Sequence, residues 1–460
     1  MNEKSQIPSG WVKTNLEDCV DILDYLRIPI NSQEREERIS GKELQNLYPY
    51  YGATGQVGNI DGFLFDEEIL LLGEDGAPFL DSLKNKAYLI QGKSWVNNHA
   101  HVLRAKSGFT ENLFLMHYLN FFDYHDYVTG TTRLKLNQAQ MRRIPVFLPP
   151  LDEQERIVAK IETLFSQLDS GVASLKRIQA ALKRYRASVL KAAFEGKLVP
   201  QDPADEPATG LLEELFGAKY LEKIAPSEIS ILPYVPPGWA FGKLENLIYI
   251  AGRIGWRGLK AEEYTLDGPL FLSVFNLNKG DYIDFTDVHH ISIERYDESP
   301  EIQLRENDIL LTKDGAGIGK IGIVKNLPGK ATVNSSLLVI RASKIFIPEF
   351  LFYFLKGPQM QDVVRARVTG SATPHLFQRD IKQFTLLIPP LIEQKKIVIE
   401  IEQRLSVLSE VEKMITAQLA HSHRLRQTIL KSAFEGRLVS QNNFTTQAPG
   451  EFERNSHEDK

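Results

Sequence analysis

Two stretches of the chain decide its architecture: PPLDEQERIVAKIETLFSQL at residues 149–168 and PPLIEQKKIVIEIEQRLSVL at residues 389–408. A second pair of similar stretches follows them, VLKAAFEGKLV at 189–199 and ILKSAFEGRLV at 429–439. Both pairs are separated by 240 positions, so the segment between the two motifs has the same length in each copy. Flexible linkers drift in length, whereas packed helices do so less freely. We therefore predict that the chain carries two copies of one rigid element.

Each of the two segments has the apolar spacing of a long helix. From Ile157 to Val189, apolar residues recur every three or four positions, a mean of about 3.56, which lies between the heptad and the free helix. Asp152 is a candidate N-cap of the first helix, and Gly196 and Gly436 are candidates for the glycine that ends each helix. Because one such helix cannot hide its apolar stripe, we expect the two to pair as an antiparallel coiled coil. A stripe that packs only on its own domain is the alternative.

Upstream of each helix lies a segment with weaker internal similarity. Pro-x-Gly-Trp at 8–11 returns at 236–239, and EEILLLGEDGA (67–77) resembles NDILLTKDGA (307–316). Val-Thr-Gly at 128–130 also returns, at 368–370. The offsets of these matches range from 228 to 240, which indicates a common scaffold with loops of unequal length. Strand-like runs such as AYLIQG and SLLVIRA alternate with glycine turns and helical patches, so both segments are expected to be mixed α/β domains.

The sequence therefore predicts an α/β protein with internal pseudo-twofold symmetry, in which two mixed α/β domains are separated by two long helices. We assign the chain as follows: first domain 1–148, first long spacer helix 149–200, acidic linker with one short helix 201–235, second domain 236–388, second long spacer helix 389–441, and disordered tail 442–460.

Composition excludes several classes of protein. Of the 460 residues, 43% are apolar and 25% are charged, as in a soluble globular protein of two to four domains. The sequence has no apolar run of 18 residues and no apolar signal stretch at its start, so we expect a cytoplasmic protein. Its single cysteine, Cys19, excludes an intramolecular disulfide and a cysteine zinc cage. Because the net charge is −5, DNA binding would need locally placed positive charge.

Motifs for catalysis are incomplete. DGAGIGKI (314–321) lacks the first glycine and the Ser or Thr of a phosphate loop, and GIGKIG (317–322) leads into a strand-like run, which predicts a turn-rich hairpin. Glu393-Gln394-Lys395 with Asp380 loosely fits a metal-dependent nuclease, but we favour a salt bridge at the helix start. The histidines lack the HExxH spacing of a zinc site. We predict neither a catalytic nor a metal site.

Taken together, these motifs resemble the specificity subunit of a Type I restriction-modification enzyme. The resemblance covers about residues 8 to 441 and rests on the duplicated Pro-x-Gly-Trp, PPL-x-EQ and FEG-x-L motifs. It implies that each α/β domain is a target-recognition domain that reads one half of a split, asymmetric DNA site, while the helices set the spacer between the halves. It implies, as partners, double-stranded DNA, two modification (methyltransferase) subunits and restriction (endonuclease/translocase) subunits, and no membrane. S-adenosylmethionine, ATP and Mg would be used by those subunits, and no cofactor by this non-catalytic chain.

Polar loop residues beside glycines are the candidates for DNA contact, because phosphates attract Lys and Arg while base edges are read by polar side chains. The candidates in the first domain are Tyr51, Thr54, Thr129, Thr131, Thr132 and Arg133. Those in the second domain are Arg253, Trp256, Arg257, Lys313, Thr369, Ser371 and Thr373. For each of them an ordinary surface turn is the alternative. Two other functions stay open for the whole chain: an architectural coiled-coil adaptor and a stand-alone nuclease.

Overall fold

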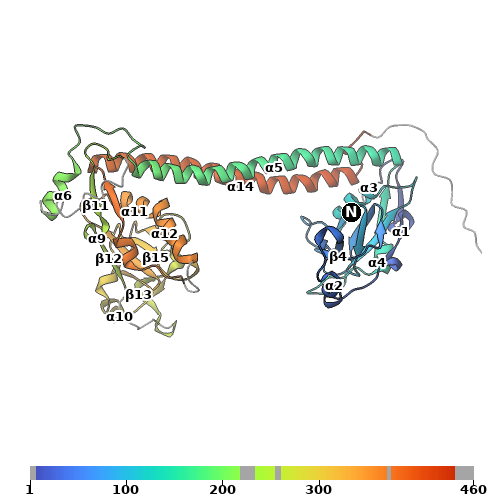
Figure 1. Ribbon diagram of the computed structural model, residues 1–460, viewed down its shortest axis with the longest axis horizontal. Coiled ribbons are helices and arrows are strands. Elements are labelled where there is room, and N and C mark those ends of the chain that lie inside the picture. Colours follow the sequence, from blue (N-terminus) through green and yellow to red (C-terminus); the bar gives the residue numbers. More distant parts are fainter. Residues whose placement is uncertain (1–6, 218–233, 254–258, 260, 370–373, 441–460) are drawn as a thin grey trace, which may run out of the picture. The chain divides into compact units, whose positions relative to one another are not determined.

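The chain folds into two compact units, each assembled from segments that are far apart in the sequence. The structure, a computed structural model, describes residues 7–217, 234–253, 259, 261–369 and 374–440. Unit 1 consists of Met1–Arg177 with Ile415–Lys460, and unit 2 of Ile178–Met414. The two long helices, α5 (Leu151–Phe194) and α14 (Leu391–Phe434), each contribute one part to each unit (Figure 1).

Unit 1 contains three small sheets, with the strand orders β1-β10, β2-β9-β6-β7 and β4-β3-β8-β5. Its strand pairs are antiparallel, apart from the parallel pair β3 and β8. The strands are β1 (Val12–Asn15), β2 (Val20–Ile22), β3 (Tyr48–Gly52), β4 (Gly55–Ile60), β5 (Phe65–Asp66), β6 (Ile69–Gly73), β7 (Ala87–Ile90), β8 (Lys93–Val96), β9 (Ala100–Ala105) and β10 (Pro145–Leu148). The α-helices before α5 are α1 (Leu16–Cys19), α2 (Ser32–Ile39), α3 (Asn112–Phe121) and α4 (Gln138–Arg142).

Unit 2 repeats this arrangement, with the strand orders β11-β19, β12-β18-β15-β16 and β14-β13-β17, and again with one parallel pair, β13 and β17. The strands are β11 (Ala240–Lys243), β12 (Ile248–Gly252), β13 (Thr265–Leu272), β14 (His289–His290), β15 (Ile309–Thr312), β16 (Ile321–Ile323), β17 (Ala331–Val333), β18 (Leu337–Ala342) and β19 (Thr385–Ile388). Among the described residues of this unit, the α-helices before α14 are α6 (Ala208–Phe216), α9 (Leu244–Leu247), α10 (Ile293–Asp297), α11 (Pro348–Lys356), α12 (Pro358–Thr369) and α13 (Gln378–Lys382). By its place in the sheet, β15 corresponds to β6.

These inner strands are almost entirely apolar, with Thr312 at the end of β15 as the polar exception, because both of their faces are covered. In β6, Leu70 and Leu72 share a core with the side chains of α3, whereas Ile69 and Leu71 face a second cluster. Every residue of β6 and of β15 is buried. An uninterrupted apolar run is the expected signature of such a strand, and it is the run by which the sequence already marked both strands.

The long helices pair antiparallel inside each unit, as predicted. In unit 1, Arg156 donates to the carbonyl of Ser440 over 2.9 Å and Arg426 pairs with Asp169 over 2.5 Å, so rising numbers on α5 meet falling numbers on the other segment. In unit 2, an ion pair of 3.1 Å joins Arg186 of α5 to Glu412 of α14.

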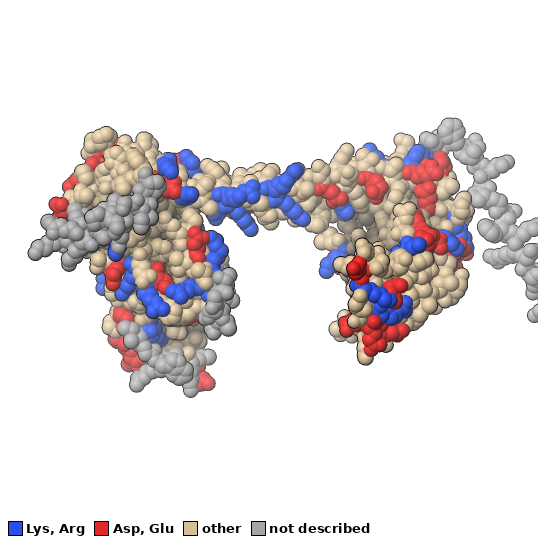
Figure 2. All heavy atoms as spheres, viewed as in Figure 1, with Lys and Arg blue, Asp and Glu red and all other residues tan. Residues whose placement is uncertain are grey.

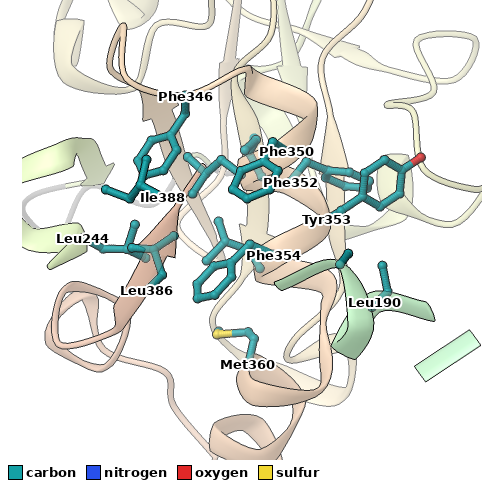
Figure 3. Close-up of a cluster of buried hydrophobic side chains, with 14 of the residues drawn as sticks. Leu190, Leu244, Phe346, Phe350, Phe352, Tyr353, Phe354, Met360, Leu386 and Ile388 are labelled. Atoms are coloured by element: carbon teal, nitrogen blue, oxygen red, sulfur yellow. The ribbon is translucent and has the colours of Figure 1, made fainter. Parts of the chain in front are cut away.

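The C-terminal end of each long helix packs in a core that contains several aromatic side chains. In unit 1 the ring of Phe434 lies 5.1 Å from that of Tyr118 and 5.6 Å from those of Phe114 and Phe121 on α3. In unit 2, Leu190 belongs to the same core as the aromatic residues of α11 (Figure 3). The core of each unit therefore includes the C-terminal end of a long helix that begins in the other unit.

A buried hydrogen bond explains why the Pro-x-Gly-Trp and PPL-x-EQ motifs occur together. The indole Nε1 of Trp11 donates to Glu153 Oε1 over 3.1 Å, and that of Trp239 donates to Glu393 Oε2 over 2.9 Å. Burial raises the pKa of both carboxyl groups. The salt bridge expected for Glu393 is thus wrong: its partners are the Trp239 indole and the Gln201 amide.

The glutamine of the PPL-x-EQ motif, at the start of each long helix, donates hydrogen bonds to main-chain carbonyl groups. Gln154 Nε2 donates to the carbonyl groups of Phe109 and Pro149, and Gln394 Nε2 to those of Ile345 and Pro389. Both glutamine residues are fully buried. Main-chain carbonyls that lie between strand and helix are thereby satisfied without water.

Three local predictions can be compared with the structure directly. Asp152 is not an N-cap, because α5 begins one residue earlier and places it in the first turn. Gly196 and Gly436 end their helices in the left-handed region, with φ of 67° and 68°. The GIGKIG stretch (317–322) begins at the end of a 3-10 turn, Gly315–Gly317, and leads into β16, which pairs antiparallel with β15, so the hairpin is confirmed. Within the described ranges, no helix has the length and apolar character that crossing a membrane requires.

Candidate nucleic-acid interface

A polar loop formed by residues 129–135 lies at the C-terminal end of β6. The main chains of Thr129 and Lys135 exchange two hydrogen bonds of 2.9 and 2.8 Å, which close the loop at its base. Gly130 has φ of 98°, and a Cβ there would lie 2.4 Å from the carbonyl oxygen of Arg133, so the tight turn requires glycine. Thr131, Thr132 and Arg133 are exposed at the tip. The loop thus presents two hydroxyls and one guanidinium to solvent.

The 129–135 loop is attached to the two acidic residues that follow β6. Asp75 forms a β-bridge with Lys135, and its carboxylate lies 2.8 Å from Arg133 Nε. Glu74 lies 3.5 Å from the amino group of Lys135. The side chain of Arg133 nevertheless stays 61% exposed, so a phosphate group can reach the guanidinium from outside. Acidic partners on the inner side hold these cations in one place without hiding them.

The turn between β3 and β4 lies against the same end of β6. The two elements approach closely, since a Cβ on Gly73 would lie 3.0 Å from the carbonyl oxygen of Ala53. Thr54, the next residue of the turn, is exposed beside this end of the strand. Tyr51 is placed differently. Its ring packs against Tyr88 at 6.2 Å and is half-buried in the core. The structure therefore brings Thr54 and the 129–135 loop to one end of the sheet, but it does not bring the Tyr51 side chain there.

Unit 2 has a related arrangement at the end of β15. Asp314 forms a β-bridge and a side-chain hydrogen bond with His375, and it also pairs with Lys313 over 3.1 Å. The carbonyl of Lys313 accepts a hydrogen bond of 2.9 Å from Leu376. Asp314 therefore does for the segment after α12 what Asp75 does for the 129–135 loop. The repeated Asp-Gly dipeptide after the inner strand was the sequence signal for both, although sequence reasoning did not select these aspartates.

Besides Lys313, the DNA-contact candidates of unit 2 that lie among the described residues are Arg253 and Thr369. Trp256, Arg257, Ser371 and Thr373 lie outside the described residues, and Thr369 is the last residue of α12. Arg253 follows β12. Burial, together with the nearby charge of Arg295, lowers the pKa of Arg253. The charged groups near its guanidinium thus include Arg295 of α10.

One exposed aromatic residue of unit 2 also escaped the sequence analysis. Phe377 is 41% exposed, and the guanidinium groups of Arg367 and Arg379 lie 5.6 and 4.7 Å from its ring centre. His375 packs against the same ring at 4.4 Å. Nucleobases stack on such surfaces of aromatic rings and guanidinium planes. In the repeat, Asn137 stands at this position of unit 1, where it caps α4 instead.

Positive charge also gathers on the long helices (Figure 2). The middle of α5 carries Lys176, Arg177, Lys183, Arg184 and Arg186. A chain with a net charge of −5 thus has local basic surfaces of the kind that a polyanion requires.

Comparison with known proteins identifies the family. A family model described as "Type I restriction modification DNA specificity domain" matches residues 8–184 and 268–421. The EcoBI specificity subunit of Escherichia coli is 33% identical over 297 residues, which are 64% of this chain and 58% of that subunit, less than two thirds of its length. The EcoDI specificity subunit of Escherichia coli is 25% identical, over 95% of this chain and 90% of its own length.

Solved structures show the same fold. The HsdS subunit from Thermoanaerobacter tengcongensis superposes with a TM-score of 0.51 and 18% identity, over 95% of this chain and 99% of that one. A chain from a structure described as "Structural basis underlying complex assembly and conformational transition of the type I R-M system" gives a TM-score of 0.60 at 18% identity, over 94% and 99%. The duplicated motifs, the paired helices and the match to the family model agree, and the chain belongs to the family of Type I restriction-modification specificity subunits.

Proposed function

We propose that this chain is the DNA-reading subunit of a Type I restriction-modification complex in the cytoplasm. Unit 1 binds one half of a split, asymmetric DNA site and unit 2 binds the other half, while α5 and α14 set the spacer between them. The chain positions two modification subunits and the restriction subunits on the DNA, and it carries out no catalytic step itself. S-adenosylmethionine, ATP and Mg serve those partner subunits.

The observation that carries the proposal is the duplicated loop anchor at the end of the inner strand. Asp75 after β6 and Asp314 after β15 each hold a later segment by a β-bridge and a contact of the aspartate side chain, with Arg133 in unit 1 and with His375 in unit 2. The scaffold is the same, but the side chains that it presents differ: threonines and Arg133 in unit 1, and His375 with Phe377 in unit 2. Equal scaffolds with unequal contact residues favour two half-sites of different sequence, since specificity comes from the side chains that reach base edges.

The other two functions are less well supported by the described residues. A coiled-coil adaptor would need the paired helices but not two α/β units with matching loop anchors at the end of the inner strand. A stand-alone nuclease would need free metal ligands. In the described part of the chain, the group with suitable spacing is Asp24, Glu74 and His101, and its charges are already balanced by Arg27 and Lys135.

The test is to co-express the chain with its modification subunit in a host without adenine methylation and to map N6-methyladenine across the genome. We expect a single bipartite motif that disappears when this chain is omitted. An adaptor would leave the methylation pattern unchanged on omission. Metal-dependent cleavage of DNA by the purified chain alone would favour the nuclease and contradict the proposal.

A further inference from the structure

A buried histidine in unit 1 is held between two hydrogen-bond acceptors. His101, on β9, is 1% exposed. Its Nδ1 lies 2.7 Å from Asp24 Oδ2, and its Nε2 lies 2.9 Å from the main-chain oxygen of Leu136. A carbonyl oxygen can only accept, so Nε2 must carry a proton.

The other ring nitrogen, Nδ1, lies against a carboxylate with several further partners. Asp24 accepts hydrogen bonds from the amide of Val102 and from the Gln138 side chain, and it pairs with Arg27 over 3.3 Å. Burial acts against ionisation of Asp24, but the hydrogen bond and charge of His101 outweigh it together with the other donors, so the pKa of Asp24 is lowered. The imidazole ring of His101 is thus one of several groups that surround this carboxylate.

The surrounding charges balance without a metal. Asp24, Glu74 and His101 offer ligand atoms within 4.8 Å of one another, which is suitable spacing for a cation. However, Arg27 lies between the two carboxylates, 3.3 Å from Asp24 and 2.8 Å from Glu74, and both nitrogens of His101 are already engaged. The two carboxylates are thus compensated by the guanidinium of Arg27 and, at the edge, by the amino group of Lys135.

This charged group is tied to the end of the 129–135 loop. Leu136 follows the loop directly: its carbonyl accepts from His101, and its amide donates to the carbonyl of Glu74 over 2.8 Å. Gln138, two residues further on, donates to Asp24 over 3.0 Å. The segment that leaves the loop is therefore fixed at two points, by the buried ring of His101 and by the carboxylate of Asp24.

Unit 2 has no counterpart of this histidine at the corresponding position. In unit 1, His101 lies opposite Leu72 in the pairing of β9 with β6; in unit 2, Leu338 lies opposite Leu311 in the pairing of β18 with β15. Leu338 is 1% exposed and belongs to the apolar core. The charged anchor is a special feature of unit 1, so its effect on DNA reading should be confined to one half-site.

We propose that His101 is a positioning residue, whose imidazole ring bridges Asp24 and Leu136, holds the 129–135 loop in a single geometry and thereby sets the sequence selectivity of the half-site read by unit 1. This inference rests on the proposed function. His101 is too deeply buried to touch DNA, so it acts through the loop. Loss of the anchor lets the tip residues adopt several positions, and base discrimination then falls although the contacting side chains are all present.

The test uses the complex of the full chain with its modification subunits and His101→Gln. Glutamine can keep a donor to Asp24 but is too short to bridge to Leu136 as well. The half-site of unit 1 is identified with Thr131→Ala, which changes the loop itself. Methylation is then compared on DNA duplexes that carry a single base-pair change in one half-site or the other.

We expect His101→Gln to raise methylation of duplexes mismatched in the unit 1 half-site by about tenfold, the discrimination that one base contact provides. Duplexes mismatched in the other half-site should be methylated as rarely as by the unchanged complex. Leu338→Met, at the matching position of unit 2, is the control and should relax neither half-site. If His101→Gln proves unstable, Gln138→Met removes a neighbouring tether and should relax the same half-site to a smaller degree.

The outcomes separate the inference from the proposed function. If the His101→Gln complex and the Gln138→Met complex both discriminate at each half-site as well as the unchanged complex does, the positioning role is overturned. Equal relaxation at both half-sites overturns it too, because it would indicate a general loss of folding. If the unchanged complex has no bipartite motif at all, the proposed function itself fails, and the inference with it.

Discussion

Replacing Trp11 with phenylalanine tests the hydrogen bond that joins the two repeated motifs. The change removes the indole donor, 3.1 Å from Glu153, and leaves a carboxyl group that is 5% exposed. A hydrogen bond to a charged group contributes about 1.5–3 kcal/mol, so we expect unit 1 to lose about 2–3 kcal/mol of unfolding free energy at neutral pH. Trp239→Phe is the matched variant. Because Glu393 still accepts from Gln201 over 3.1 Å, its cost should be smaller by about 1 kcal/mol, the value of one ordinary hydrogen bond.

The cost of Trp11→Phe should also depend on pH. Burial raises the pKa of Glu153 above its usual 4.5, so the folded state favours the protonated form. Stability linked to this group is therefore fully present below pH 4.5 and is lost as the pH rises through the raised pKa. Without the indole donor the ionised form is still less favourable, and the pKa rises further. The penalty of the variant should be largest at neutral pH and should shrink as the solution is made acidic.

The assay is denaturant unfolding at several pH values, with hydrogen exchange of β1 and β10 reporting on unit 1 and that of β11 and β19 on unit 2. Glu153→Gln serves as the control, since it keeps an acceptor for the indole but carries no charge. In that background, Trp11→Phe should lose its pH dependence. A penalty that is equal at pH 4 and pH 7, or that stays below about 0.5 kcal/mol, would refute this account of the motif.

Three further changes have expected results. Phe434→Ala should lower the unfolding free energy of unit 1 by about 3–5 kcal/mol in denaturant unfolding, because that ring is fully buried. Phe194→Ala should lower that of unit 2 by less, since Phe194 is half-buried. Equal losses would contradict the packing described. Gly196→Ala should cost unit 2 at least about 1–2 kcal/mol for its positive φ, whereas Gly210→Ala within α6 should be neutral or stabilising; thermal unfolding compares the two. Arg133→Ala should weaken DNA binding by the complex and reduce the slope of log affinity against log salt by about one, and an unchanged slope would exclude a phosphate contact.

The elements with strong local patterns could be predicted from the sequence. The apolar spacing of α5 and α14 and the uninterrupted apolar runs of β6 and β15 are visible in short windows, because burial of a stripe or of both faces imposes its own period. The exposed tip of the 129–135 loop was also selected correctly as a surface loop, since Gly130 and the threonines are local turn chemistry. Whether these residues contact DNA stays a prediction.

The residues that hold the candidate interface together could not be predicted in this way. Trp11 and Glu153 are 142 positions apart, and each looks ordinary in its own window, one in a turn and the other at a helix start. His101 was noticed only as one of several histidines. Its meaning depends on Asp24 and Leu136, which come from different elements and approach it only in the folded sheet.

The sequence by itself determined that the chain is a duplicated α/β protein with two long helices, because repeats of equal length and helical periodicity are properties of the chain alone. Only the tertiary structure decided how each unit is closed. The end of α14 completes the core of unit 1 and the end of α5 that of unit 2, with Phe434 and Leu190 among aromatic residues of a domain that lies elsewhere in the sequence. The physical reason is that burial is a sum over neighbours in space. In the sequence, an apolar residue at a helix end looks the same whether it packs on its own domain or on the other one.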